Sequence, residues 1–178
     1  MLRKTLDFIY DAAGYLAAFF VFAICMIMVV ASIMRQTGFR TGGTDELVSW
    51  ITGAAAFMGL AHTFKHGDFV RVGLLIESLG PKMRRVFEFV ALLIATVFMG
   101  YIFWALYNYV HLSYVLHDMA KGQIVIPMWI PQASVVIGAF LLFIALLDEL
   151  ILVIMNRIPT YVRAVEERHA RGDFSEDV

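Results

Sequence analysis

Charged residues are absent from four long stretches of this sequence. No Asp, Glu, Lys or Arg occurs in 12–34, 47–64, 89–117 or 122–147. A helix of about 20 apolar residues crosses a hydrocarbon core about 30 Å thick, and in lipid only helices and closed barrels pair all their backbone groups. None of the stretches shows the period of two that a barrel strand needs. The sequence therefore predicts an all-α integral membrane protein with four transmembrane helices.

Other scarcities exclude further classes of protein. The chain has one cysteine, Cys25, which excludes an intrachain disulfide. The formal net charge is −1, so there is no basic field of the kind that binds nucleic acid. Hydrophobic residues make up 61% of the 178 residues, and the apolar stretches use more than half of the chain. We therefore predict a single four-span membrane domain over 1–178.

The predicted spans cover about 12–34, 47–64, 89–111 and 131–151, and a charged tail covers 156–178. Between the second and third spans, 69–79 is predicted to form a short amphipathic helix in the membrane interface. Five apolar residues fall near one face of this segment and a basic residue lies on another: Phe69, Val72, Leu75, Ile76 and Leu79, with Arg71. An ordinary connector is the alternative.

Lysine and arginine are unevenly divided between the two sides of the predicted membrane. Eleven of the fourteen lie in the N-terminal segment, the second loop and the tail, and three lie in the other two loops. The positive-inside rule then predicts that both termini are cytoplasmic. Arg3 and Lys4 precede an apolar run that is too long for a signal peptide and has no cleavage site, so we interpret it as an uncleaved first span.

Ionisable carboxylates and amines are also absent from the predicted mid-membrane region. Asp148 and Glu149 are placed in the inner interface by counting 20 residues from the start of the last span. Asp7 and Asp11, four residues apart, are interpreted as a solvated helix end, with an ion pair to Arg84 or Arg85 as the alternative. Ion-coupled carriers need ligands at mid-membrane. The chain is therefore expected to be a subunit whose active partner is another chain.

Histidines are the remaining candidates for cofactor chemistry. His62 and His66 have the i, i+4 spacing that can hold a metal, but a metal needs further ligands from elsewhere. His111 and His117 are predicted on the other side of the membrane, whereas a haem between helices requires histidines that face each other at the same depth in the membrane. We therefore predict no catalytic residue, no cofactor and no metal in this chain, and assign no role to His62 and His66.

Small residues recur at a spacing of four in three of the predicted spans. Such residues let helix backbones approach closely. They are predicted to form helix-packing or partner interfaces, and the three pairs are Ser49 with Gly53, Thr96 with Gly100, and Ser134 with Gly138.

The two outer loops carry the candidates for docking a partner. Thr44 is a suitable N-cap, and Asp45 and Glu46 in the next positions suit the positive end of a helix dipole, which explains them without a partner. The alternative is that Asp45 and Glu46 dock a partner protein. Before the last span come Pro127, Trp129 and Pro131; the prolines forbid a regular helix across this segment, and Pro131 suits the first helical turn.

The order of these features resembles a known family. Gly-Thr-Asp-Glu-Leu (43–47) opens the second span, Gly-Asp-Phe-Val-Arg-Val-Gly-Leu (67–74) follows it, and Ile-Pro-Met-Trp-Ile-Pro (126–131) precedes the last span. Together they resemble the small membrane subunit, DctQ-like, of tripartite ATP-independent periplasmic (TRAP) transporters over about 5–155. Phe69 and Gly73 stand where that family often has His and an acid. Roles of that His and acid therefore cannot be transferred to this chain, and in this segment only Arg71 and Val72 match the family pattern.

This resemblance implies a subunit of a bacterial inner-membrane secondary transporter. A large multispan permease would hold the Na⁺ and substrate sites, and a periplasmic solute-binding protein would deliver an organic acid. The small subunit would scaffold the permease in the lipid bilayer and help dock the binding protein. Two other hypotheses stay open at this point. The chain could be a haem-binding anchor of a redox complex, with His62 or His111 as ligands, or a self-sufficient small carrier or channel.

Overall fold

The computed structural model describes residues 2–39, 41–66, 81–155 and 160. The predicted interfacial helix 69–79 and the predicted tail, apart from Thr160, lie outside the described residues. Both of these therefore stay predictions.

Four long helices make up the described part of the chain. They are α1 (Leu2–Gln36), α2 (Thr44–His66), α4 (Pro81–Val115) and α5 (Trp129–Ile154). Each is long and apolar enough to cross a membrane. Within the described residues the only β-structure is an isolated bridge between Met119 and Pro127. The prediction of an all-α protein with four transmembrane helices is thus confirmed.

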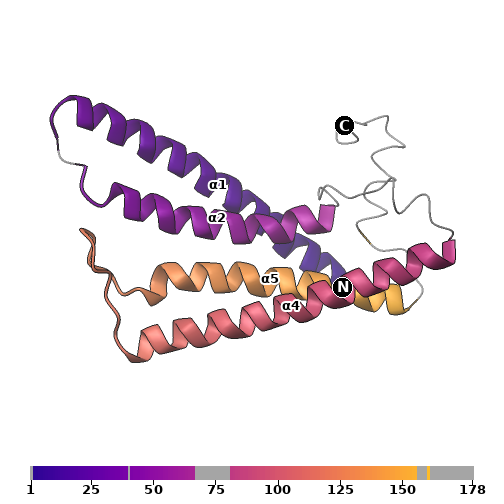
Figure 1. Ribbon diagram of the computed structural model, residues 1–178. Coiled ribbons are helices and arrows are strands. Elements are labelled where there is room, and N and C mark those ends of the chain that lie inside the picture. The colour runs from indigo at the N-terminus through magenta and orange to yellow at the C-terminus, as the bar shows by residue number, and fades with distance from the viewer. Residues whose placement is uncertain (1, 40, 67–80, 156–159, 161–178) are drawn as a thin grey trace, which may run out of the picture.

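The helices pack as a row in which α2 and α5 are central (Figure 1). The substantial contacts join α1 to α2, α2 to α5, and α5 to α4. In the most apolar 18-residue stretch of each helix, half of the residues of α5 are buried inside the protein, whereas only 11% of those of α1 and 17% of those of α4 are buried. The two flanking helices therefore present most of their apolar side chains outward, as helices do when lipid or another membrane protein covers them.

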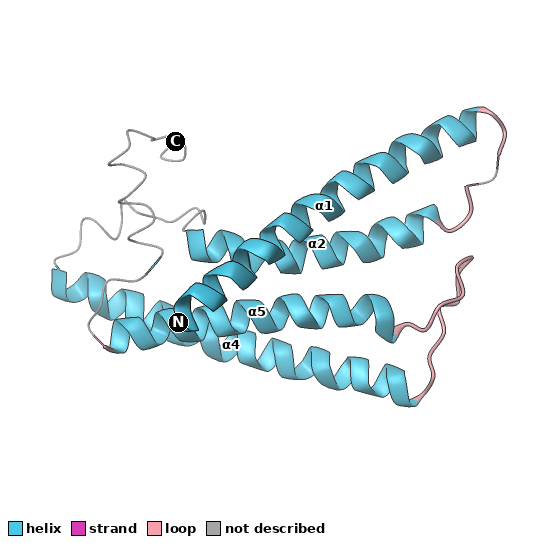
Figure 2. Ribbon diagram, turned by 180° about the vertical axis from the view of Figure 1, so that it is seen from behind, coloured by secondary structure: helices cyan, strands magenta, loops and turns pink. Residues whose placement is uncertain are grey.

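The bundle has two distinguishable ends (Figures 1 and 2). At one end α1 and α4 begin and α2 and α5 finish; we call this the N-terminal end. At the other end lie the α1–α2 and α4–α5 connections; we call this the loop end. Near the N-terminal end α1 crosses close to α2 and α5, and it diverges from α5 toward the loop end. Helices α2 and α5 run in the same direction.

Apolar side chains fill the contacts between these helices in three clusters. The largest joins α4 and α5 through Leu92, Met99, Leu146 and their neighbours. A second joins α1, α2 and α5 where Tyr10 is fully buried against two alanines. Small residues at the α1–α2–α5 contact let three backbones approach, which is how membrane helices gain packing energy.

Candidate functional site

A lysine is buried between two carboxylates near the N-terminal end of the bundle. The Nζ of Lys65 on α2 lies 2.8 Å from Oδ2 of Asp148 and 3.2 Å from Oε1 of Glu149, both on α5. The Glu149 side chain is fully buried and that of Lys65 is 6% exposed. Charges this far from water persist only when they are paired and hydrogen-bonded. We call these three residues the Lys65 cluster.

Two further groups complete the surroundings of the Lys65 cluster. The second carboxylate oxygen of Glu149, Oε2, accepts a hydrogen bond of 2.8 Å from the backbone N–H of Thr160. The Lys65 ammonium also lies 5.6 Å from the centre of the Tyr10 ring on α1, within the range of a cation–π interaction. The cluster therefore joins α1, α2, α5 and a residue beyond α5.

Sequence reasoning missed this cluster because it treated the three residues separately. The positive-inside count includes Lys65 among the charges of the second loop, and the two acids are predicted in the inner interface. The sequence does hold the necessary information: Lys65 is 21 residues beyond Thr44, and Asp148 is 19 residues beyond Trp129. Since α2 and α5 are parallel, opposite charges at matching depths on two predicted spans could have been paired.

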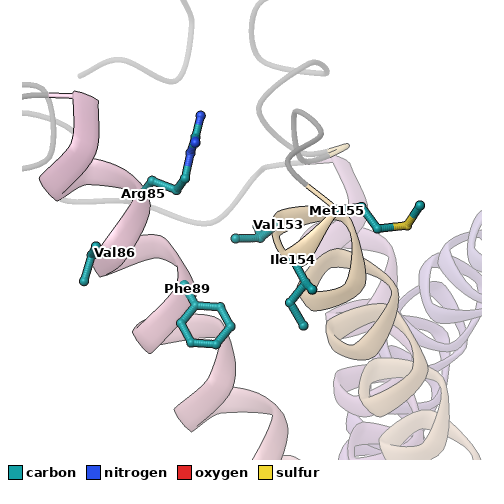
Figure 3. A pocket seen from close by; sticks show the side chains of 6 residues that line it. All are labelled: Arg85, Val86, Phe89, Val153, Ile154 and Met155. Atoms are coloured by element: carbon teal, nitrogen blue, oxygen red, sulfur yellow. The ribbon is translucent and has the colours of Figure 1, made fainter.

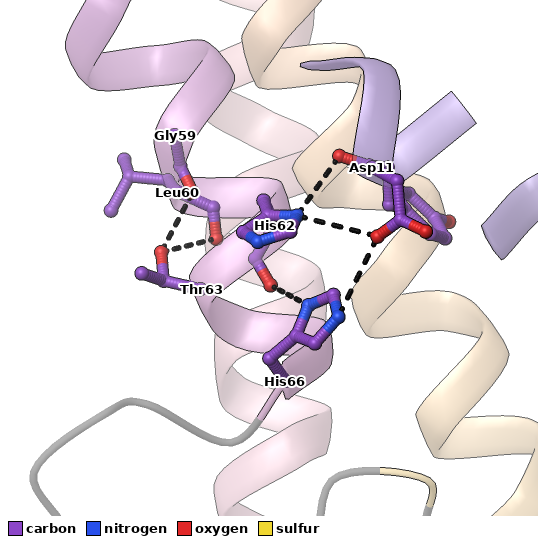
Figure 4. A network of polar contacts seen from close by, with 7 residues as sticks. Asp11, Gly59, Leu60, His62, Thr63 and His66 are labelled. Atoms are coloured by element: carbon purple, nitrogen blue, oxygen red, sulfur yellow. Dashed lines mark hydrogen bonds and ion pairs between the residues drawn. The ribbon is translucent and has the colours of Figure 1, made fainter. Parts of the chain in front are cut away.

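A second group of polar side chains lies beside the Lys65 cluster, between α1 and α2 (Figure 4). Asp11 Oδ1 is 3.6 Å from His62 Nδ1 and 3.5 Å from His66 Nε2. The two imidazole rings are 4.1 Å apart between centres. We call Asp11, His62 and His66 the histidine cluster. It replaces the sequence-based alternative of an Asp11–Arg85 ion pair, since the ionic contacts of Asp11 within the described residues are with these histidines; the Arg84 side chain lies outside them.

The other two histidines that the structure describes lie far from this cluster along the helices. His111 is on the last turns of α4 and His117 follows that helix, so both lie toward the loop end, and both are exposed. The four histidines of the described residues are thus divided between opposite ends of the bundle. The described residues provide no facing pair at one depth that would suit a haem.

At the loop end a single carboxylate joins the two outer connections. Glu46, in the first turn of α2, accepts hydrogen bonds from the backbone N–H groups of Gln123 at 2.9 Å and Ile124 at 3.3 Å. Asp45 beside it is exposed. The hydroxyl of Thr44 donates to the Thr41 carbonyl at 3.0 Å instead of capping helix amides. Glu46 therefore has a structural contact within the chain.

The other predicted docking candidates lie around the start of α5. Pro131 is the third residue of α5, which confirms its predicted place in the first turn. The Trp129 ring packs edge-on against Tyr114 at the end of α4, with 5.7 Å between ring centres. Pro127 forms the isolated bridge with Met119. These residues thus hold the α4–α5 connection in shape, and their docking role stays a prediction.

The predicted small-residue pairs lie at different kinds of position. A Cβ added at Gly138 would lie 2.6 Å from the backbone of Phe57, so α5 approaches the backbone of α2 here. At Gly100 it would meet the Phe143 ring at 2.9 Å, and at Gly53 the Val135 side chain at 3.4 Å. The three hydroxyl residues donate to carbonyls of their own chain within four residues: Ser49 to Asp45, Thr96 to Leu92, and Ser134 to Pro131.

These glycines therefore lie at contacts between helices of this chain. Ser49 is exposed and Thr96 is buried, so the hydroxyl members of the pairs do not form one continuous surface. Their predicted role at a partner interface is untested by these contacts and stays a prediction.

A shallow groove of about 490 Å³ opens between α4 and α5 at the N-terminal end (Figure 3). Phe89 lies on its α4 side and Ile154 on its α5 side, and Arg85 extends beyond the apolar part. One arginine beside apolar side chains is an ordinary arrangement for a helix end in the headgroup region. The described side chains that line the groove include none of the acids, histidines or nucleophiles typical of a catalytic site.

Comparison with known proteins assigns this architecture. The family model described as tripartite ATP-independent periplasmic transporters, DctQ component, matches residues 24–156. The match includes α2, α4 and α5 whole, together with about the last third of α1. A search of curated proteins finds no matching sequence.

Proposed function

Because the family model covers most of its length, the chain belongs to the DctQ component of the TRAP transporters, and we propose that it scaffolds the large ion-coupled permease during organic-acid uptake. A periplasmic solute-binding protein is the third partner in this proposal. The family match carries the assignment. The finer role rests on the physical features of the four helices.

The distribution of polar groups supports a subunit that does not itself carry solute. Within the described residues, the buried charges of the Lys65 cluster are paired with one another, and Glu46 is occupied by backbone amides. A carrier needs polar groups that are available to bind and release its solute near mid-membrane. The polar contacts seen here hold helices and loops together, which suits a scaffold.

The flanking helices supply the surfaces by which such a scaffold would contact lipid and permease. Large apolar side chains are exposed along both α1 and α4, among them Phe19 and Phe22 on α1 and Phe98 and Trp104 on α4. A membrane-embedded partner can cover one such face by close packing while lipid covers the other. We propose that one flank contacts the permease.

The orientation follows from the basic residues. The positive-inside rule favours a cytoplasmic N-terminal end and a periplasmic loop end, and the family supports the proposal that the membrane is a bacterial inner membrane. The loop end would then face the binding protein, with Asp45 exposed and Trp129 supported by Tyr114. We propose this end as the docking side.

Co-purification tests the proposal most directly. The chain, carrying a small affinity tag, is expressed in its native host, extracted from the membranes in mild detergent and recovered. We expect a large multispan permease in equal amount, identified by mass spectrometry. Deletion of this chain should abolish uptake of the transported acid, and re-expression should restore it. A chain recovered alone, or normal uptake without it, would show that the proposal is wrong.

A further inference from the structure

The histidine cluster brings together three side chains of the type that bind transition metals. Its donor atoms come from two helices and all lie within 4.8 Å of one another. In a tetrahedral site with bonds of about 2.0–2.1 Å, neighbouring donors are about 3.3 Å apart. The N–O spacings of 3.5 and 3.6 Å are close to that value. We propose that Asp11, His62 and His66 bind a divalent transition-metal ion of the zinc class.

The hydrogen bonding of His66 prepares its second nitrogen for a metal. His66 Nδ1 lies 3.0 Å from the His62 carbonyl oxygen, so this nitrogen carries the proton and donates it. When the ring is protonated, Nε2 forms an ion pair with Asp11. In the neutral ring, Nε2 presents a lone pair toward Asp11 Oδ1, 3.5 Å away. Two electron-rich atoms facing each other favour a cation between them. Metal-binding histidines usually donate their other N–H to a carbonyl or carboxylate, as His66 does.

Packing against α1 fixes the second imidazole. A Cβ added at Gly14 would lie 2.6 Å from both Cγ and Nδ1 of His62, so only glycine leaves room for this ring. His62 Nδ1 also lies 3.2 Å from the Tyr10 carbonyl oxygen. That carbonyl is the hydrogen-bond partner of Nδ1 when no ion is bound, and a metal competes with it.

The donor set selects the class of ion. Two imidazoles and one carboxylate suit zinc, nickel or cobalt, whereas magnesium and calcium prefer oxygen ligands throughout. The side chains of Asp11, His62 and His66 are 48%, 33% and 44% exposed, which admits an ion from solution and leaves room for water as a further ligand. A bound ion would fix the beginning of α1 to the last turn of α2.

Metal titration of the purified chain tests this site. The chain, together with any partner that co-purifies, is prepared without a polyhistidine tag, treated with chelator and titrated with Zn²⁺ by calorimetry. We expect one saturable site per chain and a higher thermal midpoint with the ion. His66→Gln and Asp11→Asn should each weaken binding by about tenfold or more. His111→Gln, an exposed histidine at the opposite end, is the matched control and should bind as the wild type does.

A second variant and a second ion guard against effects of misfolding. Gly14→Ala keeps all three donors but displaces the His62 ring, so it should also weaken binding. Co²⁺ bound to folded wild-type protein should give visible absorption bands of a tetrahedral site with nitrogen ligands, and Zn²⁺ should remove them. Equal Zn²⁺ affinity in wild type and Asp11→Asn, or no Co²⁺ bands, would overturn the proposal and leave a proton-bridged contact.

Discussion

The two ends of the helix bundle are held together in different ways. At the N-terminal end, Lys65 and Glu149 are almost wholly buried, and both Glu149 and the partly buried Asp148 contact the lysine ammonium. At the loop end, Glu46 meets backbone amides of the opposite connection in a more exposed setting. A buried charge must keep its partner, whereas an exposed carboxylate can turn to water. The stability of the fold is therefore expected to depend much more on the first contact than on the second.

Removing the buried cation should have the largest effect. Lys65→Met leaves two carboxylates close together and unpaired, and breaking a buried pair costs about 3–5 kcal/mol. We expect a strongly lowered thermal midpoint in detergent, or loss of folded protein. Lys121→Met, at an exposed lysine of the loop end, is the control and should change little.

A triple variant that removes all three charges distinguishes the effect of unpaired charge from the effect of altered packing. Lys65→Met combined with Asp148→Asn and Glu149→Gln removes all three charges together, and it should recover much of the lost stability, because apolar or neutral replacements of whole buried pairs are often tolerated. If the triple variant is no more stable than Lys65→Met alone, unpaired charge is not the cause of the defect.

Closing the gap between the central helices should have an intermediate effect. Gly138→Ala places a methyl group against the Phe57 backbone, which cannot move aside as a side chain can, and overpacking costs about 1–3 kcal/mol. Gly53→Ala meets only the Val135 side chain at 3.4 Å and is the matched control. Thermal midpoints of the two variants, measured side by side, should differ clearly; equal values would contradict the close approach at Gly138.

Changing the loop-end contact should have the smallest effect. Glu46→Gln keeps an acceptor oxygen but loses the charge shared by the Gln123 and Ile124 amides, so we expect a loss of about 1 kcal/mol. Asp45→Asn, one residue away and exposed, should be neutral. A loss as large as that of Lys65→Met would contradict the contrast between the two ends.

Patterns along the sequence were sufficient for the helices and insufficient for their polar contacts. Charge-free stretches predicted four spans because lipid imposes a minimum apolar length on each helix. Pro131 marked the start of α5 because proline fits a first helical turn. Contacts such as Asp11 with His66, or Glu46 with Gln123, depend on which helix lies beside which, and local periodicity carries no information on that order.

The small-residue pairs also show that a sequence pattern does not identify the neighbouring helix. The spacing of Ser134 and Gly138 predicts a packing or partner interface, but it does not reveal which neighbour approaches. Gly138 turned out to face Phe57 of the same chain. Histidine spacing on α2 likewise indicated half of a possible metal site, and only the position of α1 supplies Asp11 as a third donor.

The Lys65 cluster also has a consequence for biosynthesis. Lys65 and Asp148 are 83 residues apart, so during synthesis the lysine on α2 is made and inserted long before the acids on α5 exist. Until the last span arrives, the ammonium can remain near water only if the end of α2 stays close to the membrane surface. The charges can therefore pair only once the last span is in place, so the contact between the ends of α2 and α5 has to form late in the assembly of the bundle.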